Sequence, residues 1–485
     1  MNRIGEGVSA TEWHILKNFL YLCHIHKHKS NIMAEQKTFG TRIGLIAATV
    51  GSAVGLGNVW RFPAEVQQGG GAAFLIIYIG CVVLLGLPVM LSEMALGRAG
   101  RTDVVDVFTR FSPRKPWWVA GGIALFASYL ILCFYMVVAG WTLEYLWESV
   151  NGNLFAGVSS QSLESGFHAK MESFICSDFG PLTATYIMIV LNLGVLLMGV
   201  RKGIERAGNI MMPVLFVLLL IFVVVALQMP RAKEGLAYFL NPDWSQITPS
   251  TVIDALGQAF FSLSLGMGIL ITYAAYYPHQ TNLGRTACTV AGLDLLVAFM
   301  MGIIIFPAVM SFGLEGDGLR GTTLVFVTLP EVFASMPAPQ LWAILFFLLL
   351  LLAALTSTIS ISEVSVSFVC DRFGLSRTKA CLVVLAPLFI LSALCSLSFG
   401  SLADIQLFGR NIFDFLDMLA TNICLPLASM LTCIYIGWKA PRNLLPDQLT
   451  NNGTIRLRVY PVILWIIRLV APALILLIWL SNFLN

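Results

Sequence analysis

Long runs of apolar residues recur along the whole of this 485-residue chain, and they constrain its fold more than any other feature. A helix needs about 20 apolar residues to cross a bilayer. Charged residues make up only 11% of the chain, against roughly 25% in an ordinary globular protein. We therefore predict an all-α polytopic membrane protein. Its eleven candidate transmembrane helices are 43–63, 72–97, 117–147, 181–200, 207–228, 251–277, 287–312, 339–369, 379–398, 411–437 and 460–484.

The positions of the charges predict how the chain is oriented. Most of the 29 Lys and Arg residues lie in the N-terminal tail and in every second connection between the spans. Because cytoplasmic loops carry an excess of Lys and Arg, the N-terminus is expected in the cytoplasm and, after eleven spans, the C-terminus outside. The net charge is only +3, so the expected surroundings are the lipid bilayer, and nucleic acid is not expected as a partner.

Two of the predicted helices contain glycine clusters halfway along. The first span holds Gly51-Ser-Ala-Val-Gly-Leu-Gly-Asn58, and the sixth holds Ser262-Leu-Ser-Leu-Gly-Met-Gly268. Each cluster alone also fits close packing of helices through small residues. As a pair they indicate more, because span 1 opens one set of five spans and span 6 opens the next set in the opposite direction. This pattern predicts an inverted repeat with two broken helices that meet at the middle of the bilayer, as in transporters.

Broken helices supply groups that bind ions and zwitterions. Unwinding frees carbonyl oxygens, the ligand type that hard cations such as Na⁺ prefer, and exposes amides that favour a carboxylate. Thr356 and Ser357 share a face with Ala353 in span 8, and Asp294 lies in span 7. The two hydroxyls have an alternative role, which is to bond carbonyls of the preceding turn. A carboxylate inside a membrane span indicates function by default.

Five motifs resemble those of the neurotransmitter:sodium symporter family, and the likeness covers residues 36–485, nearest to the bacterial amino-acid transporter branch. The motifs are Gly51-Ser-Ala-Val-Gly-Leu-Gly-Asn-Val-Trp-Arg-Phe-Pro63, Ser92-Glu-Met-Ala-Leu-Gly-Arg98, Lys202-Gly-Ile-Glu-Arg206, Phe261-Ser-Leu-Ser-Leu-Gly-Met-Gly268 and Leu355-Thr-Ser357. The resemblance implies a LeuT-like 5+5 inverted repeat in a bacterial-type inner (plasma) membrane. The expected parts are a cytoplasmic tail (1–35), a five-helix repeat (36–230), a second, inverted repeat (231–437), and a loop with the eleventh helix (438–485).

The resemblance also implies two sodium sites beside one substrate site. The first sodium site, Na1, is expected to use the Ala53 carbonyl, Asn58, Ser262, Asp294 and the carboxylate of the substrate. The second, Na2, is expected to use Gly51, Val54, Ala353, Thr356 and Ser357. The substrate carboxylate is expected at the Gly57 amide and the Tyr135 hydroxyl, and its amino group at the carbonyls of Ala53, Phe261 and Ser264. The implied side-chain pocket is Ile131, Phe261, Ser264, Met267 and Ile361.

The gate residues of this chain match those of the family less completely than the sodium-site and substrate-site residues do. The expected gates are Arg61, Asp417 and Phe261 on the outer side, and Asp371, Tyr276 and Lys37 on the inner side. Where the family has an inner-gate Arg, this chain has Gln36, and Lys37 is the expected substitute. An ammonium group lacks the bidentate fork of Arg, so the inner gate is expected to be built differently.

The expected function is sodium-coupled symport of a neutral, hydrophobic L-amino acid by alternating access, because the implied pocket has no fixed charge. Two Na⁺ ions are expected, and chloride is left open because Asp294 itself supplies a negative charge. A homodimer is also left open. The alternatives are a non-transporting amino-acid sensor of the same fold and a channel, which would need a continuous polar pore. The sequence contains no nucleophile–base pair, HExxH motif or P-loop, so no enzyme is expected.

Overall fold

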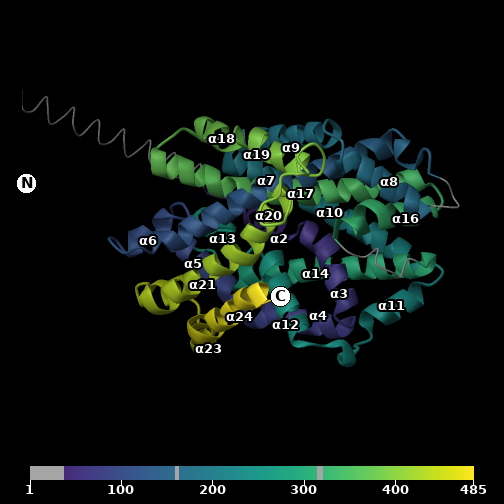
Figure 1. The fold of residues 1–485 in the computed structure, drawn as a ribbon. Coiled ribbons are helices and arrows are strands. Elements are labelled where there is room, and N and C mark those ends of the chain that lie inside the picture. The colour runs from purple at the N-terminus through teal and green to yellow at the C-terminus, as the bar shows by residue number, and fades with distance from the viewer. Residues whose placement is uncertain (1–37, 159–162, 314–320, 485) are drawn as a thin grey trace, which may run out of the picture.

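Helices make up the regular structure of the residues that the computed structural model describes, which are 38–158, 163–313 and 321–484 (Figure 1). Within these ranges the chain forms no strand, and two isolated β-bridges join Gly71 to Pro242 and Leu407 to Arg410. The predicted tail, 1–35, lies outside the described residues.

Nine helical stretches of the described chain are long and apolar enough to cross a bilayer. Several contain a π-helical turn, labelled η. The stretches are α4 (Ala72–Cys81) with η2 (Val82–Gly86) and α5 (Leu87–Gly100); α7 (Trp118–Val150); α9 (Gly180–Leu197); η4 (Val200–Glu205) with α10 (Arg206–Leu227); α14 (Leu283–Phe312); α17 (Pro339–Phe373); α18 (Arg377–Leu385) with α19 (Leu388–Leu397); α20 (Ile412–Met418) with η8 (Leu419–Cys424), α21 (Leu425–Ile434) and η9 (Tyr435–Lys439); and α23 (Tyr460–Trp465) with η10 (Ile466–Val470) and α24 (Ala471–Leu484).

The first and sixth predicted spans are interrupted. In the first, α2 (Arg42–Ala53) is followed by η1 (Gly57–Arg61) and α3 (Phe62–Gln68) at an angle of 54°. If this bent pair is one span, the described residues hold ten spans. In the sixth, α12 (Pro249–Ser262) and α13 (Ile269–Ala275) are separated by residues 263–268. The all-helical fold is as predicted, whereas the count of eleven stays a prediction.

Shorter helices connect the spans. They are α6 (Asp106–Phe111), η3 (Asn153–Phe155), α8 (Leu163–Ile175), α11 (Ala232–Leu240), η5 (Trp244–Gln246), α15 (Gly321–Thr323), η7 (Leu324–Thr328), α16 (Leu329–Ala334) and α22 (Leu444–Thr450).

Backbone conformation and close packing explain where the two helices break. At the first break, a Cβ added to Gly55 would lie 2.8 Å from Ser357 Oγ. At the second break, Ser264, Gly266 and Gly268 have φ angles of 54°, 76° and 73°, a left-handed conformation that cannot continue an α-helix. A Cβ on Gly266 would also lie 2.5 Å from the carbonyl oxygen of Leu425.

The breaks face each other in the interior of the bundle. α2 packs against α10, α14 and α17, and the long helices α7 and α17 pack along each other. In Figure 1, α9, α18 and α19 cover α7 and α17 at the top, while α21, α23 and α24 lie together at the lower left. The hydroxyl of Ser264 donates a hydrogen bond to the carbonyl oxygen of Ser52 at 2.7 Å. This contact joins the second break directly to the first.

Candidate functional site

A cavity of about 30 Å³ lies between the two breaks. This volume holds about two water molecules, so a larger ligand requires its walls to separate. All eight substrate residues expected from the resemblance line this cavity, and none of the described residues around it is charged. The lining residues are Ser52, Ala53, Gly55, Gly57, Asn58, Ile131, Tyr135, Phe261, Ser262, Ser264, Met267, Ser357 and Ile361.

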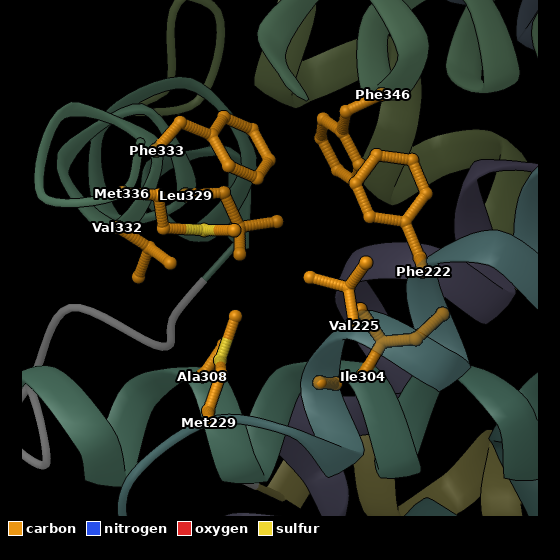
Figure 2. Close-up of a pocket in the computed structure, with 11 residues that line it drawn as sticks. Phe222, Val225, Met229, Ile304, Ala308, Leu329, Val332, Phe333, Met336 and Phe346 are labelled. Atoms are coloured by element: carbon orange, nitrogen blue, oxygen red, sulfur yellow. The ribbon is translucent and has the colours of Figure 1, made fainter. Parts of the chain in front are cut away.

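A second cavity, of about 10 Å³, lies between α10, α14, α16 and α17 and differs in chemistry. Figure 2 shows the side chains of Phe222, Phe333 and Phe346 lying around it. The residues that line it are all apolar, so it offers no partner for the charges of an ion or a zwitterion. The cavity between the breaks is therefore the candidate site.

Backbone amides meet a tyrosine hydroxyl at one end of the candidate site. The amide of Leu56 donates to the Tyr135 hydroxyl oxygen at 3.1 Å. Leu56 precedes the helical stretch that starts at Gly57, where unpaired amides and the helix dipole favour an anion. Nε2 of Gln258 donates to the Gly57 carbonyl at 3.3 Å, and Gln258 Oε1 has no partner among the described residues. The site therefore contains Leu56 and Gln258 in addition to the expected Gly57 and Tyr135. The sequence analysis missed these two residues because the glycine pattern does not indicate them.

Three of the residues expected at Na1 are brought together around the buried carboxylate of Asp294. Ser262 Oγ donates to Asp294 Oδ2 at 2.6 Å, and Asn58 Nδ2 donates to Asp294 Oδ1 at 2.9 Å. Tyr78 contributes a longer contact of 3.5 Å from its hydroxyl. All four side chains are buried. A buried carboxylate that has only neutral donors is costly, and a small cation bound beside these oxygens would offset that cost.

Carbonyl oxygens are released at the end of α2, where Na2 was expected. In a continuous helix the Gly51 carbonyl would accept from the amide of Gly55. Here that amide donates to Asn58 Oδ1 at 3.2 Å instead. Ser357 Oγ lies 3.4 Å from the carbonyl oxygens of both Gly51 and Val54. These oxygens form a cluster of the kind that hard cations prefer.

Thr356 completes the group of residues expected at Na2. Its hydroxyl donates to the carbonyls of Leu352 and Ala353, each at 3.0 Å, which is the back-bonding alternative raised for this helix. Thr356 nevertheless faces the break, because a Cβ on Gly51 would lie 3.1 Å from Thr356 Cβ. The described residues hold no group of three His, Cys, Asp or Glu side chains suited to a metal, so the ion chemistry here is that of carbonyl, hydroxyl and carboxylate oxygens.

On the predicted outer side, Arg61 lies over the candidate site. Its guanidinium carbon is 5.4 Å from the centre of the Phe261 ring. Both side chains line a further cavity of about 70 Å³. The ion pair of Arg61 in this structure is with Glu65, one turn along the helix, at 3.5 Å. No Arg61–Asp417 ion pair forms within the described residues, and this pairing stays a prediction.

On the predicted inner side, a carboxylate ties three helices together. Glu363 of α17 is fully buried and accepts from the Tyr276 hydroxyl at 2.8 Å. Arg377 at the start of α18 binds both oxygens of Glu363, at 3.0 and 2.7 Å. The ring of Phe39 packs on Tyr276 with centroids 6.3 Å apart. Tyr276 thus bonds to Glu363, whereas the expected Lys37 lies outside the described residues.

A model of one protein family matches residues 36–166 and 168–485 of the chain, and that family is the sodium:neurotransmitter symporters. The chain belongs to this family. It is a sodium-dependent transporter, and its relatives are transporters rather than enzymes.

Individual relatives of this symporter come from bacteria, archaea and animals. The uncharacterized sodium-dependent transporter YhdH of Bacillus subtilis is 34% identical over 93% of this chain and 98% of its own. The uncharacterized sodium-dependent transporter MJ1319 of Methanocaldococcus jannaschii is 34% identical over 88% of this chain and 86% of its own. The sodium-dependent serotonin transporter of Drosophila melanogaster is 31% identical over 75% of this chain and 65% of its own.

A solved structure resembles the whole symporter. The crystal structure of MhsT in complex with L-phenylalanine superposes with a TM-score of 0.83, at 40% identity, and the match covers 92% of this chain and 99% of that one. The predictions of the family and of the LeuT-like membrane fold are therefore confirmed.

The Glu363–Arg377 pair, on the predicted inner side, is the main polar contact that the sequence analysis missed. The signal was present, because Glu363 is a charged residue inside the 35-residue helix α17, and such residues are rare in spans. Its partner lies 14 residues further on, beyond the turn after α17. Only the fold reveals that this turn brings Arg377 back to Glu363.

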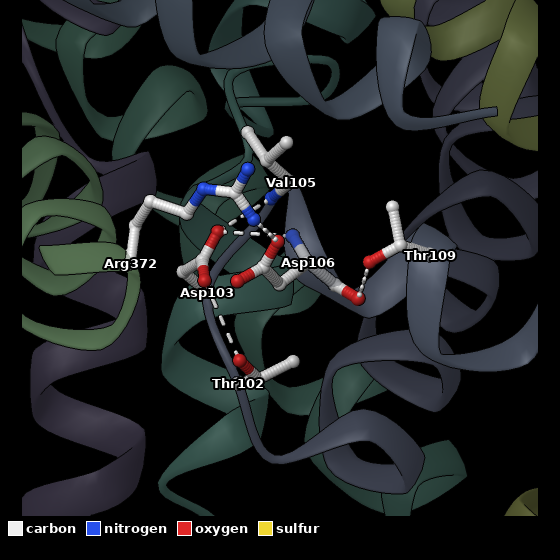
Figure 3. Close-up of polar contacts among 6 residues, drawn as sticks. All are labelled: Thr102, Asp103, Val105, Asp106, Thr109 and Arg372. Atoms are coloured by element: carbon white, nitrogen blue, oxygen red, sulfur yellow. Dashed lines mark hydrogen bonds and ion pairs between the residues drawn. The ribbon is translucent and has the colours of Figure 1, made fainter. Parts of the chain in front are cut away.

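A second polar cluster of the symporter lies between α5 and α6, on the same side as Arg377. Figure 3 shows Asp103 turned toward the backbone nitrogens of Val105 and Asp106, and Arg372 reaching Asp106. Asp103 Oδ1 accepts from the two nitrogens at 2.8 and 3.0 Å, and the Arg372–Asp106 ion pair is 3.1 Å. Burial raises the pKa of Asp103 to about 6. This carboxyl therefore titrates close to neutral pH.

Proposed function

We propose that this symporter uses two Na⁺ ions to drive uptake of a neutral, hydrophobic L-amino acid by alternating access. The observation that carries the proposal is the cavity between the breaks. Amides and the Tyr135 hydroxyl lie at one end of it, and the apolar side chains of Ile131, Met267 and Ile361 line the remainder. A zwitterion needs polar partners for its charged groups, and an apolar pocket selects an apolar side chain.

Met267 bears on the size of the substrate. It lies in the left-handed segment between α12 and α13, and its flexible side chain adapts to different shapes. The neighbour MhsT was crystallised in complex with L-phenylalanine. We propose that aromatic and large aliphatic amino acids share the pocket, and that charged amino acids are excluded because the pocket offers no countercharge for their side chains.

Uptake of radiolabelled amino acids into proteoliposomes tests both parts of the proposal. An inward Na⁺ gradient is expected to drive accumulation of leucine or phenylalanine, while excess unlabelled lysine or glutamate leaves it unchanged. Equal uptake with K⁺ replacing Na⁺ would contradict symport. Competition by lysine as strong as that by leucine would contradict the proposed specificity and leave symport intact.

The second ion site has a matched pair of variants. Ser357→Ala removes the hydroxyl beside the carbonyls of Gly51 and Val54. Thr358→Ala removes the neighbouring hydroxyl, which bonds Ala354 and Leu355 of its own helix. Substrate binding by Ser357→Ala is expected to need at least tenfold more Na⁺, whereas Thr358→Ala keeps the original Na⁺ dependence. Equal Na⁺ dependence in the two variants would refute the site.

We further propose that this symporter does not require chloride, because the Asp294 carboxylate supplies a fixed negative charge beside Asn58 and Ser262. Replacing chloride with gluconate at constant Na⁺ is expected to leave uptake unchanged. A loss of uptake in gluconate would show that an additional anion is needed.

A further inference from the structure

The helix that starts at Tyr460 carries an arginine inside an otherwise apolar span. Arg468 lies in η10, within the span Tyr460–Leu480, and its side chain is exposed on the surface of the protein. A guanidinium in a membrane span is costly unless it reaches water, a protein partner or a lipid headgroup. No carboxylate of the described residues lies within ion-pair distance of Arg468.

The structure holds this guanidinium in one place. Arg468 Nε donates to the Gly437 carbonyl at 2.6 Å, and the guanidinium carbon lies 5.5 Å from the centre of the Trp438 ring. The indole of Trp438 in turn donates to the Arg468 carbonyl at 3.1 Å. Gly437 is needed for this approach, because a Cβ there would lie 2.9 Å from Arg468 Cγ. The two terminal nitrogens of Arg468 make no hydrogen bond to the described part of the chain, so they are available to a ligand.

The depth of this site corresponds to the membrane boundary. Gly437 and Trp438 are in the last turn of the span Ile412–Lys439, so Arg468 beside them lies at the end of that span. Trp438 and Trp465 are 59% and 58% exposed, and tryptophan is enriched where hydrocarbon meets headgroups. Arginine and aromatic side chains therefore gather at headgroup level.

The surrounding charge favours an anion. The stretch from Trp438 to Arg468, which includes the connection between the two spans and the span ends on either side, contains Lys and Arg at five positions and a single acid, Asp447. The basic residues are Lys439, Arg442, Arg456, Arg458 and Arg468. Basic residues beside a span attract anionic lipids of the cytoplasmic leaflet, the side on which the distribution of Lys and Arg places this connection.

We propose that Arg468, stacked on Trp438, binds the phosphate of an anionic phospholipid in the cytoplasmic leaflet. A guanidinium presents paired N–H donors that match two phosphate oxygens. From the headgroup the lipid chains run into the bilayer along the exposed apolar side chains that follow Arg468 on the same helical stretch, which are Leu469, Leu476 and Leu477. A bound lipid in this position fastens the last span to the end of the preceding one through Arg468 and Gly437.

Native mass spectrometry of the delipidated full-length transporter tests the proposal. The probes are phosphatidylglycerol and phosphatidylcholine with identical chains. The wild type is expected to bind its first phosphatidylglycerol about tenfold more tightly than phosphatidylcholine, and Arg468→Gln to lose this preference. Arg468→Lys keeps the positive charge but loses the paired N–H donors of the guanidinium. Its preference for phosphatidylglycerol is expected to lie between those of the wild type and Arg468→Gln. Arg456→Gln removes an exposed charge from the same connection and is the control that keeps the preference.

Three results would contradict the proposed lipid site. Equal phosphatidylglycerol binding by the wild type and Arg468→Gln would overturn the proposal. An equal loss in Arg456→Gln would show a diffuse positive field in place of a site. Displacement of the lipid by about 10 mM inorganic phosphate, a concentration that fills a site with a millimolar Kd, would show a free-phosphate site. Na⁺-dependent thermal stabilisation of Arg468→Gln, measured in parallel, verifies that the variant is folded.

Discussion

Glu205 holds the start of α2 against α10, and its replacement should loosen the first helix. Its carboxylate is 4% exposed and accepts three hydrogen bonds. They come from the Gly40 amide at 2.7 Å, the Thr41 amide at 2.9 Å and the Thr41 hydroxyl at 2.7 Å. Gly44 lies directly against the same side chain, since a Cβ there would be 2.2 Å from Glu205 Cγ. These contacts form a charged clamp at the N-terminus of α2, where the helix dipole favours an anion.

The size of the effect follows from the number of contacts. A hydrogen bond to a charged group contributes about 1.5–3 kcal/mol, against about 0.5–1.5 kcal/mol for a neutral one. Glu205→Gln keeps the shape of the side chain, but its single oxygen accepts only the two Thr41 bonds, now as neutral bonds, and its NH₂ group faces the Gly40 amide, so the third bond is lost. The loss is therefore about 3 kcal/mol, which corresponds to roughly a hundredfold rise in the population with α2 released.

Hydrogen–deuterium exchange of the peptide covering residues 39–49 measures this release directly. Exchange in Glu205→Gln is expected to be about a hundredfold faster than in the wild type, because exchange follows the population of the open form. Glu234→Gln is the control, since Glu234 pairs with Arg231 on the surface at 2.6 Å and such pairs contribute little. Unchanged exchange in Glu205→Gln would refute the clamp.

Three further predictions concern other acids. Asp294→Asn should raise the Na⁺ concentration needed for substrate binding by at least tenfold, about 1.4 kcal/mol, because the carboxylate charge is lost; an unaltered Na⁺ dependence would exclude Asp294 from the ion site. Glu363→Gln should lower the free energy of unfolding by about 3 kcal/mol, because Arg377 loses a bidentate partner. The double variant Glu363→Gln/Arg377→Leu should lose less stability than Glu363→Gln alone, and thermal unfolding of both variants measures this difference. For Asp103, a folded pKa of about 6 against the ordinary 3.8 means that the folded state binds the proton more tightly than the unfolded state. The contribution of Asp103 to stability therefore falls by about 2 kcal/mol as pH rises from 4 to 6, out of about 3 kcal/mol over the full titration. Asp103→Asn should be more stable than the wild type at pH 7.5 and lose this advantage at pH 4, and equal melting temperatures of the two proteins at pH 7.5 would contradict this.

Prediction from the sequence was most reliable for residues that are rarely found inside a membrane span without a specific structural role. Paired glycine clusters at the middle of two spans have little reason to exist other than unwinding, and both α2 and α12 end within them. Asp294 stood out because a carboxylate inside a span needs a partner. The structure then brings it to Asn58 and Ser262, which lie 236 and 32 residues away.

Prediction failed where a partner depends on a turn or on the direction of a side chain. Arg377 is the first residue of α18, directly after the turn that follows α17. The sequence does not indicate the direction of its side chain after this turn. Glu205 lies in the motif Lys202-Gly-Ile-Glu-Arg206, which contributed to the family resemblance. Its contact with the start of α2 arises because α10 packs on α2, and no local sequence pattern indicates that packing. The outer pair of Arg61 and Asp417 stays a prediction; in this structure Arg61 pairs with Glu65 one turn away, a neighbour that the helix itself supplies.

The break in the first span links ion binding to the Glu205 clamp. α2 has only 12 residues, a length of about 18 Å, and it does not continue into the helical stretch that starts at Gly57. One end is held by Glu205, and the other carries the free carbonyls of Gly51 and Val54 beside Ser357. A short helix is marginal by itself, so the position of α2 depends on its packing against α10, α14 and α17 and on the contacts at its two ends. An ion bound among those carbonyls, as proposed above, would join α2 to α17 and add to the polar contacts that Glu205, Tyr277 and Ser264 make with the helix. For this reason Na⁺ and Glu205 should act on the same equilibrium, and Na⁺ should slow exchange of residues 39–49 by a similar factor in the wild type and in Glu205→Gln.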